Sequence, residues 1–254
     1  MKHLPNLFTL INLVFGSLAI IFVLQTGQTL VNINEETLTI SLPEKVLLGS
    51  MCIGIAALVD FFDGLVARLC KATSSLGKEL DSLADVVSFG VAPGMILFQF
   101  LRMSFAKQQD GLDISILWLL PALLIPCASA YRLAKFNIDS SQQFGFKGVP
   151  TPATALLIAS LPLIFWYSNS ETIISFLLNK WVLYGIILVL SYLMISNLPL
   201  MALKFNNFSI QKNMPKLILL VISIVAVIFL KWLAVPIIFI FYIVLSLAFK
   251  NKTT

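Results

Sequence analysis

Four aspartates lie within residues 60–85 of a chain in which only 11% of the residues are charged. The stretch reads DFFDGLVARLCKATSSLGKELDSLAD. Its first half has intervals of i, i+3, i+4, i+7 and i+8, which place on one face of an α-helix Asp60, Asp63, Gly64, Ala67 and Arg68. Its second half has intervals of i, i+4 and i+8 and places on one face Gly77, Asp81 and Asp85. A short polar connector at 70–76 separates them, so we predict an antiparallel helix pair whose carboxylates converge.

The four carboxylates indicate a metal site. Ionised carboxylates near lipid cost several kcal/mol each unless cations neutralise them. A ligand set of oxygen atoms alone favours a hard ion, Mg²⁺ or Mn²⁺. Two such ions, roughly 3.5–4 Å apart, clamp a phosphoryl group during in-line displacement. We therefore predict metal-dependent transfer of a phosphate group, with two divalent cations held by Asp60, Asp63, Asp81 and Asp85.

Small and basic residues accompany the aspartates. Gly64, Ala67 and Gly77 lack bulk, so a phosphate-bearing ligand can approach the helix backbone closely. Arg68 can make bidentate contacts to phosphate oxygens. Taken singly, the small residues are more often helix-packing contacts, and Arg68 is equally a flanking residue of a membrane span.

The rest of the chain consists of apolar segments that must position this site. With 254 residues, 59% of them hydrophobic, and a mean hydropathy of +0.96, it is predicted to be an all-α polytopic membrane protein. We place membrane spans at 7–25, 44–69, 77–105, 114–136, 150–168, 172–197, 214–231 and 233–249. The last two are alternatively one long broken segment. Three isolated cysteines indicate neither a zinc site nor a disulfide framework, and nothing supports nucleic-acid binding.

The distribution of basic residues predicts the orientation. With a cytoplasmic N-terminus, twelve of the 17 basic residues lie inside: Lys2, Arg68, Lys71, Lys78, Arg132, Lys135, Lys147, Lys204, Lys212, Lys216, Lys250 and Lys252. The positive-inside rule thus places both termini and the aspartates at the cytoplasmic face, and the loop 25–43 outside. With no cleavable leader expected, a bacterial cytoplasmic membrane is the default location.

Further polar residues lie near the same face. Asn6, Thr9 and Asn12 follow one another at i, i+3 and i+6 along the first span. They face the same pocket or bond neighbouring helices. Arg132 and Lys135 share one face at the cytoplasmic end of the fourth span.

The aspartate stretch resembles the CDP-alcohol phosphatidyltransferase family. Its signature, D-x2-D-G-x2-A-R-x8-G-x3-D-x3-D, is matched at each fixed position from Asp60 to Asp85. The resemblance implies a six-helix membrane core, usually a homodimer, with a cavity open to the cytoplasm and to the lipid. It implies two divalent ions and a CDP-linked donor that releases CMP, with Asp85 as general base on the acceptor hydroxyl. The resemblance assigns contacts to the CDP group to Asp60, Gly64, Ala67, Arg68 and Gly77.

Flanking segments resemble the phosphatidylserine synthase branch of that family. They are the PN-x2-T-x2-N start, DSLADVVSFGVAP from Asp81, RLAKFN from Arg132 and F-x-G-x-P-x-P-A from Phe146. The mild departures from the usual branch sequence are Lys135, Val149, Thr151 and Thr154. The resemblance covers residues 4–200 and leaves the last two spans weakly matched. We therefore expect a catalytic membrane domain over 1–200 and a C-terminal transmembrane extension over 201–254.

CDP-diacylglycerol and L-serine are the expected substrates, in contact with membrane lipids. Because the metals are committed to the pyrophosphate, the serine carboxylate needs another cation, for which we propose Arg132. Lys135, Asn6 and Asn12 are further candidate acceptor contacts. Alternatives are another acceptor, such as glycerol-3-phosphate, inositol or choline, and a cation or proton transporter with intramembrane carboxylates. The absence of visible repeats and the position of the aspartates at span ends disfavour transport.

Overall fold

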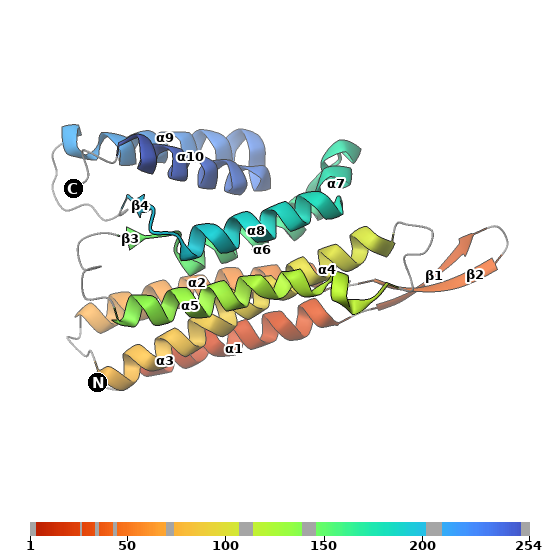
Figure 1. Cartoon of the computed structure of the whole chain (residues 1–254), viewed down its shortest axis with the longest axis horizontal. Coiled ribbons are helices and arrows are strands. Elements are labelled where there is room, and N and C mark those ends of the chain that lie inside the picture. The colour runs from red at the N-terminus through yellow and green to blue at the C-terminus, as the bar shows by residue number, and fades with distance from the viewer. Residues whose placement is uncertain are drawn as a thin grey trace.

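The computed structural model describes residues 4–25, 27–33, 36–42, 45–69, 74–106, 114–138, 146–201 and 210–249. Long helices run side by side along one axis (Figure 1). The helices are α1 (Leu4–Leu24), α2 (Val46–Leu69), α3 (Ser75–Val86), α4 (Ala92–Ala106), α5 (Leu124–Ile138), α6 (Thr151–Tyr167), α7 (Glu171–Leu177), α8 (Lys180–Ile195), α9 (Ile210–Leu230) and α10 (Ala234–Ala248). The described residues also include short π- and 3-10-helical turns and two small two-stranded sheets: β1 (Gly27–Ile33) with β2 (Glu36–Leu42), and β3 (Phe146–Lys147) with β4 (Pro199–Leu200).

The predicted all-α membrane architecture is confirmed. The helices that are long and apolar enough to cross a bilayer cover Asn6–Leu24, Val46–Val66, Ser75–Ala106 and Met214–Ala248. The shorter α6 is also apolar, and the bent pair α7–α8 passes the same test. Each range predicted to span the membrane contains at least one helix.

The predicted span 172–197 is not one straight helix. It divides into α7 and α8, which are bent by 59° relative to one another. Asn179 explains the break, because its side chain accepts a hydrogen bond from the backbone N–H of Trp181 (2.9 Å) and caps the start of α8.

The loop predicted outside the membrane contains an antiparallel hairpin. β1 and β2 pair from Gly27 opposite Leu42 to Ile33 opposite Glu36. The hairpin projects beyond the helix ends (Figure 1). The position of this segment between two spans predicts only a loop, whereas its alternation of Thr and apolar residues, as in TLTISL, is the strand signal that the sequence contains.

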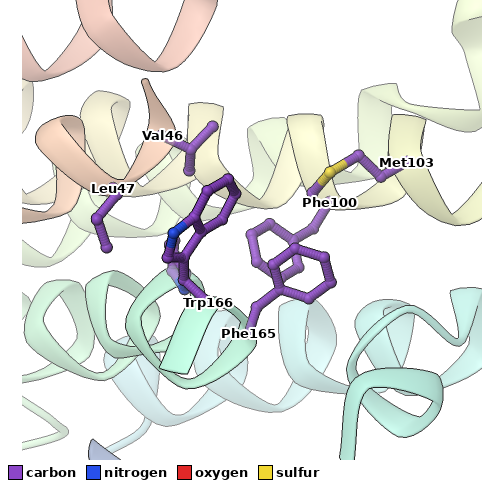
Figure 2. Close-up of a pocket in the computed structure, with 7 residues that line it drawn as sticks. Val46, Leu47, Phe100, Met103, Phe165 and Trp166 are labelled. Carbon is purple, nitrogen blue, oxygen red and sulfur yellow. The ribbon is translucent and has the colours of Figure 1, made fainter. Parts of the chain in front are cut away.

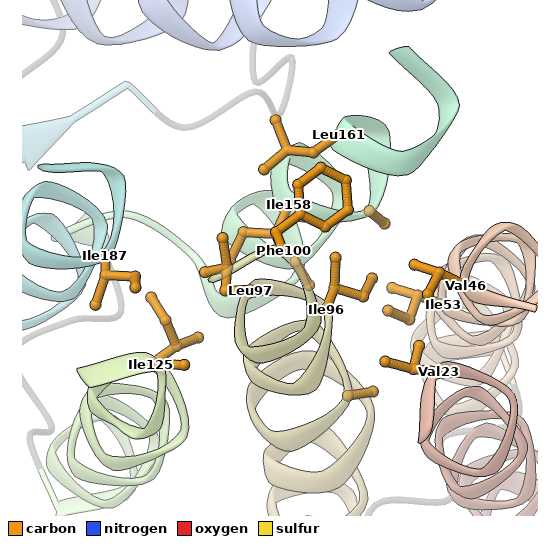
Figure 3. Packing of buried hydrophobic residues seen from close by; sticks show 14 of the residues in the cluster. Val23, Val46, Ile53, Ile96, Leu97, Phe100, Ile125, Ile158, Leu161 and Ile187 are labelled. Carbon is orange, nitrogen blue, oxygen red and sulfur yellow. The ribbon is translucent and has the colours of Figure 1, made fainter. Parts of the chain in front are cut away.

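Helix α4 lies at the centre of the bundle. Ile96, Leu97 and Phe100 are almost completely buried and are surrounded by apolar side chains from several other helices (Figure 3). The surrounding residues are Val23 of α1, Val46 and Ile53 of α2, Ile125 of α5, Ile158 and Leu161 of α6, and Ile187 of α8. The helix that follows the last aspartates is therefore held from all sides by close packing.

The C-terminal helices pack on each other and on the end of the bundle. The chain turns between α9 and α10 at Lys231, whose φ of 49° is left-handed, and the two helices then contact each other. The pair also contacts α6 and β4. Two helices joined by a short turn therefore occupy the last predicted spans, and together they form one apolar stretch, Met214–Ala248.

Candidate active site

Three aspartates converge where α2 and α3 approach one end of the bundle. Asp60 comes from α2, and Asp81 and Asp85 come from α3; each offers a carboxylate oxygen within 4.8 Å of the other two. The two helices run in opposite directions, as predicted (Figure 1). They make few direct contacts with each other, however, because α1 packs against both.

Asp63 is the fourth aspartate, and it lies beside the other three. It is buried, and its carboxylate accepts a hydrogen bond from the hydroxyl of Thr9. It still lies close enough to Asp60 and Asp81 to interact with both electrostatically. The structure therefore brings all four aspartates to one region, with Asp63 anchored to α1.

Helix α1 also contacts the part of the site that is carried by α3 and by the turn after it. The amide Nδ2 of Asn12 donates to Oδ1 of Asp85 (3.3 Å), and Ser88 Oγ donates to the backbone carbonyl of Asn12 (3.0 Å). Asn6 lies on the same face, with its Oδ1 only 3.0 Å from where a Cβ on Gly77 would stand. The polar residues of the first span thus bond side chains of neighbouring helices at the aspartates, and contact with a ligand stays a prediction.

A π-helical turn begins two residues after Asp85. It covers Val87–Val91, between α3 and α4, and buries Ser88, Phe89 and Gly90. Such a turn inserts an extra residue, so it rotates the face of the preceding helix relative to the following one. Asp81 and Asp85 can thus face the carboxylate cluster while α4 keeps its apolar contacts. Residue spacing carries no signal for this turn, and the sequence analysis missed it.

Arg132 of α5 is the buried cation of this region. It is only 8% exposed, and its Nε has no hydrogen-bond partner among the residues that the structure describes. It interacts electrostatically with Asp85. A buried guanidinium with an unsatisfied donor beside a carboxylate is well suited to receive an anionic ligand.

Lys135 has a different environment from Arg132, although the two share the end of α5. Its ammonium group donates to Oδ1 of Asn197 (2.7 Å), just after α8. Lys135 therefore ties α5 to α8 in this structure, and a role in acceptor binding remains a prediction.

Asn137 joins α5 to α3, a function that the sequence analysis did not assign. Its Nδ2 donates to Ser82 Oγ (2.8 Å), and its backbone carbonyl accepts from Lys78 Nζ (3.3 Å). These bonds span the segment that carries Asp81. Asn137 occupies the last position of the RLAKFN segment, which was the available signal.

The cavity in Figure 2 is unrelated to this site. It lies between the start of α2, α4 and the end of α6, and is lined by apolar side chains: Val46, Leu47, Phe100, Met103, Pro162, Phe165 and Trp166. None of these side chains titrates, so the cavity offers no group for proton transfer. The aspartate end therefore remains the candidate active site.

Comparison with known proteins agrees with this geometry. The model of the CDP-alcohol phosphatidyltransferase family matches residues 2–195, which include the four aspartates and α1 to α8. The chain belongs to the CDP-alcohol phosphatidyltransferase family. The family resemblance stated from the sequence is confirmed.

Three relatives of this CDP-alcohol phosphatidyltransferase share one name, CDP-diacylglycerol–serine O-phosphatidyltransferase. The protein of Helicobacter pylori is 30% identical over 234 residues, covering 89% of this chain and 81% of that protein. That of Bacillus subtilis is 32% identical over 214 residues, covering 82% and 92%. That of Saccharomyces cerevisiae is 42% identical over 111 residues, covering 40% and 36%.

The remaining residues of the family signature differ in their surroundings. Gly77 is confined, because an added Cβ would lie 3.0 Å from Asn6 Oδ1 and 3.1 Å from Ser74 Oγ. Ser74 also caps α3 by accepting from the backbone N–H of Gly77 (3.0 Å). Gly64 follows Asp63 on α2 and is exposed. The side chains of Ala67 and Arg68 lie outside the described part of the chain.

The donor set fits divalent cations. Asp60, Asp81 and Asp85 supply only oxygen, the ligand preferred by Mg²⁺ and Mn²⁺. Carboxylates held this close repel strongly, and bound cations would offset that repulsion. The aspartate cluster of this CDP-alcohol phosphatidyltransferase therefore has a donor set suited to a metal ion.

Proposed function

We propose that this chain transfers the phosphatidyl group from CDP-diacylglycerol to the hydroxyl of L-serine, giving phosphatidylserine and CMP. The observation that carries the proposal is the meeting of Asp60, Asp81 and Asp85 beside the buried Arg132. Carboxylates for metal and a cation for the acceptor thus occupy one region. The names and coverage of the relatives from Helicobacter pylori and Bacillus subtilis support serine as acceptor.

Two divalent cations, Mg²⁺ or Mn²⁺, would be held by Asp60, Asp63, Asp81 and Asp85. When bound, they would neutralise charge on the diphosphate and on the departing CMP. Asp63 accepts a hydrogen bond from Thr9, which fixes its carboxylate orientation toward α1. This second contact is the kind of support that keeps a metal ligand in place.

Asp85 would act as the general base. It takes the proton from the serine hydroxyl, whose oxygen forms a bond to the phosphorus that bears diacylglycerol. The bond between that phosphorus and the bridging oxygen breaks, and CMP leaves with the electron pair. The amide of Asn12 donates a hydrogen bond to the Asp85 carboxylate and would thereby orient the general base. Direct attack suffices, because the one histidine, His3, lies outside the aspartate stretch.

The CDP group would contact Asp60, Gly64, Ala67, Arg68 and Gly77. The confinement around Gly77 supports this part of the proposal, because a larger side chain there would displace Asn6 or Ser74. A ligand can approach the helix backbone closely at such a position.

Arg132 would bind the serine carboxylate, with Lys135, Asn6 and Asn12 as additional candidate contacts. Replacement of Arg132 by Ala should raise KM for serine about tenfold or more, the loss expected for one charge-assisted hydrogen bond. KM for CDP-diacylglycerol should change far less. Equal serine KM values in Arg132→Ala and wild type would remove Arg132 from this role.

The deciding experiment is CMP release from CDP-diacylglycerol by the purified full chain in detergent with Mg²⁺ or Mn²⁺. L-serine, glycerol-3-phosphate, inositol and choline would be compared as acceptors. Release with serine alone supports the proposed function. Release with another acceptor preserves the chemistry and changes the substrate, whereas no release with any of them contradicts enzymatic transfer and favours transport.

We also propose that the aspartate end faces the cytoplasm of a bacterial inner membrane, together with both termini. All four tryptophans, Trp118, Trp166, Trp181 and Trp232, lie at or next to the ends of helices, where they would form interfacial belts. A cysteine at position 115 should react with an impermeant maleimide added outside intact cells, and one at position 75 should not. A homodimer, implied by the family, would be tested by detergent-corrected light scattering.

A further inference from the structure

Hydrogen bonds join the end of α5 to α3, the helix that carries Asp81 and Asp85. Asn137 Nδ2 donates to Ser82 Oγ (2.8 Å), and Lys78 Nζ donates to the backbone carbonyl of Asn137 (3.3 Å). Ser82 Oγ in turn donates to the backbone carbonyl of Lys78 (3.1 Å), so these three residues bond one another in a closed set. We call Lys78, Ser82 and Asn137 the α3–α5 hydrogen-bond cluster.

Asn137 supplies two separate links within this cluster. Its carbonyl belongs to the last turn of α5, where backbone carbonyls lack a partner inside the helix. The ammonium group of Lys78 supplies a donor there, and its charge is favourable at a helix C-terminus. The side-chain bond to Ser82 is the second link, and a substitution at Asn137 can remove it while the backbone link stays in place.

A close contact joins the same two parts of the chain further along. A Cβ on Gly90 would lie 3.0 Å from both Cβ and Oγ of Ser129, so the π-helical turn after α3 touches α5 there. One turn later, a Cβ on Gly94 would lie 2.9 Å from Cδ of Pro126. Helix α5 therefore runs antiparallel to the continuous stretch from α3 to α4.

The hydrogen-bond cluster and the close contact at Gly90 bracket the functional residues. The two contacts are eight positions apart on each side of the pair. Asp85 lies between them on the α3 side, and Arg132 lies between them on the α5 side. The register of the two helices thus places these residues on facing segments. The contact at Gly90 is fully buried, whereas Ser82 and Asn137 are only partly buried, so the outer contact depends on its hydrogen bonds.

We propose that Asn137 is a positioning residue that holds α3 against α5 and thereby sets Asp81 and Asp85 relative to the Arg132 guanidinium. This inference rests on the proposed function, in which the aspartates serve the donor and the base, and Arg132 serves the acceptor. Attack on phosphorus requires the acceptor oxygen to stand about 3–3.5 Å from it. A small shift of one helix along the other therefore slows the reaction, while each substrate keeps its own contacts.

The test compares Asn137→Ala with Asn197→Ala. Asn137→Ala should lower kcat for serine-dependent CMP release about tenfold to a hundredfold, the loss expected for misplaced reacting groups. KM for serine and KM for CDP-diacylglycerol should stay near the wild-type values. Asn197 provides a matched control, because its Oδ1 accepts from Lys135 Nζ (2.7 Å) at the same end of α5, but from beyond the end of α8. Asn197→Ala should leave kcat near the wild-type value.

Variants at Ser82 test whether the effect runs through the bond to Asn137. Ser82→Thr keeps the hydroxyl and should retain the wild-type kcat. Ser82→Ala and Asn137→Ala remove the same bond, so the double variant should be no slower than Asn137→Ala alone. Losses that multiply in the double variant would overturn the proposal. So would an unchanged kcat in Asn137→Ala, or an equal loss of kcat in Asn197→Ala with the same fall in melting temperature.

Wild-type activity distinguishes failure of this inference from failure of the proposed function. Serine-dependent CMP release by the wild type, with an unchanged kcat in Asn137→Ala, overturns the positioning role alone. Lack of serine-dependent release by the wild type overturns the proposed function and this inference with it.

Discussion

The span Ser75–Ala106 is less hydrophobic than the span Met214–Ala248, yet it is the more deeply buried of the two. The apolar window of the first, which forms α3, the π-helical turn and α4, is 67% buried, whereas that of the more apolar second, which forms α9 and α10, is 17% buried. Lipid is as apolar as a protein core, so strong hydropathy marks the surface that faces lipid and not the centre of the bundle. The polar and small residues are the ones that need protein neighbours, and they carry the site.

The largest expected effect comes from replacing Asp85, which lies in the last turn of α3 within the buried span. Asp85→Asn should reduce CMP release by about a hundredfold to ten-thousandfold, the usual contribution of a general base. The variant should still fold, because Asn keeps the size of Asp and α4 packing is unaffected. Initial rates with serine, together with the melting temperature, would check this. Activity near the wild-type level would show that another group takes the proton.

A pair of phenylalanines tests the burial difference directly. Phe100 of α4 is 1% exposed and Phe229 of α9 is 77% exposed. Phe100→Ala should destabilise the protein by about 3–5 kcal/mol, because it leaves a cavity in close packing. Phe229→Ala should change stability by less than about 0.5 kcal/mol. Denaturation midpoints of the two variants in one detergent would measure the two losses of stability. Similar losses would contradict the assignment of α9 to the lipid-facing surface.

Two glycines test the close approach of α1 to the π-helical turn. A Cβ on Gly16 would stand 2.7 Å from the Cα of Ser88, whereas one on Gly185 of α8 meets nothing within 4 Å. Gly16→Ala should therefore destabilise by about 1–3 kcal/mol through overpacking. Gly185→Ala should be neutral or stabilising by up to about 1 kcal/mol, since Ala favours a helix. Melting temperatures of the two variants would measure this difference. A more stable Gly16→Ala variant would mean that the π-helical turn lies further from α1.

The smallest expected effect concerns a buried hydrogen bond from α4 to α1. Gln99 Nε2 donates to the backbone carbonyl of Val23 (2.9 Å) near the end of α1. Gln99→Leu should cost about 1 kcal/mol, since that carbonyl loses its donor in an apolar setting. Ser223→Ala in α9, whose hydroxyl only returns to its own helix at Leu219, is the control and should cost less. Equal thermal shifts in the two variants would remove the distinction between the buried and lipid-facing spans.

The helix ranges were predictable because a bilayer imposes long apolar segments on the sequence. The aspartate face was also predictable, since helical periodicity places Asp60 with Asp63 and Asp81 with Asp85. The break between α7 and α8 was missed, because a run of apolar residues satisfies the spanning criterion whether or not Asn179 caps a new helix. Strands β1 and β2 were missed because the segment was assigned only from its charge and its position between spans.

The sequence by itself determined the membrane class, the family and the residues able to bind metal, because composition, periodicity and intervals express them within single helices. The tertiary structure decided which of those residues meet. It joined Thr9 to Asp63 and Asn12 to Asp85 across α1, and it separated Lys135 from Arg132 although they are three residues apart. Contacts between distant residues depend on how whole helices pack, and no local pattern records that arrangement.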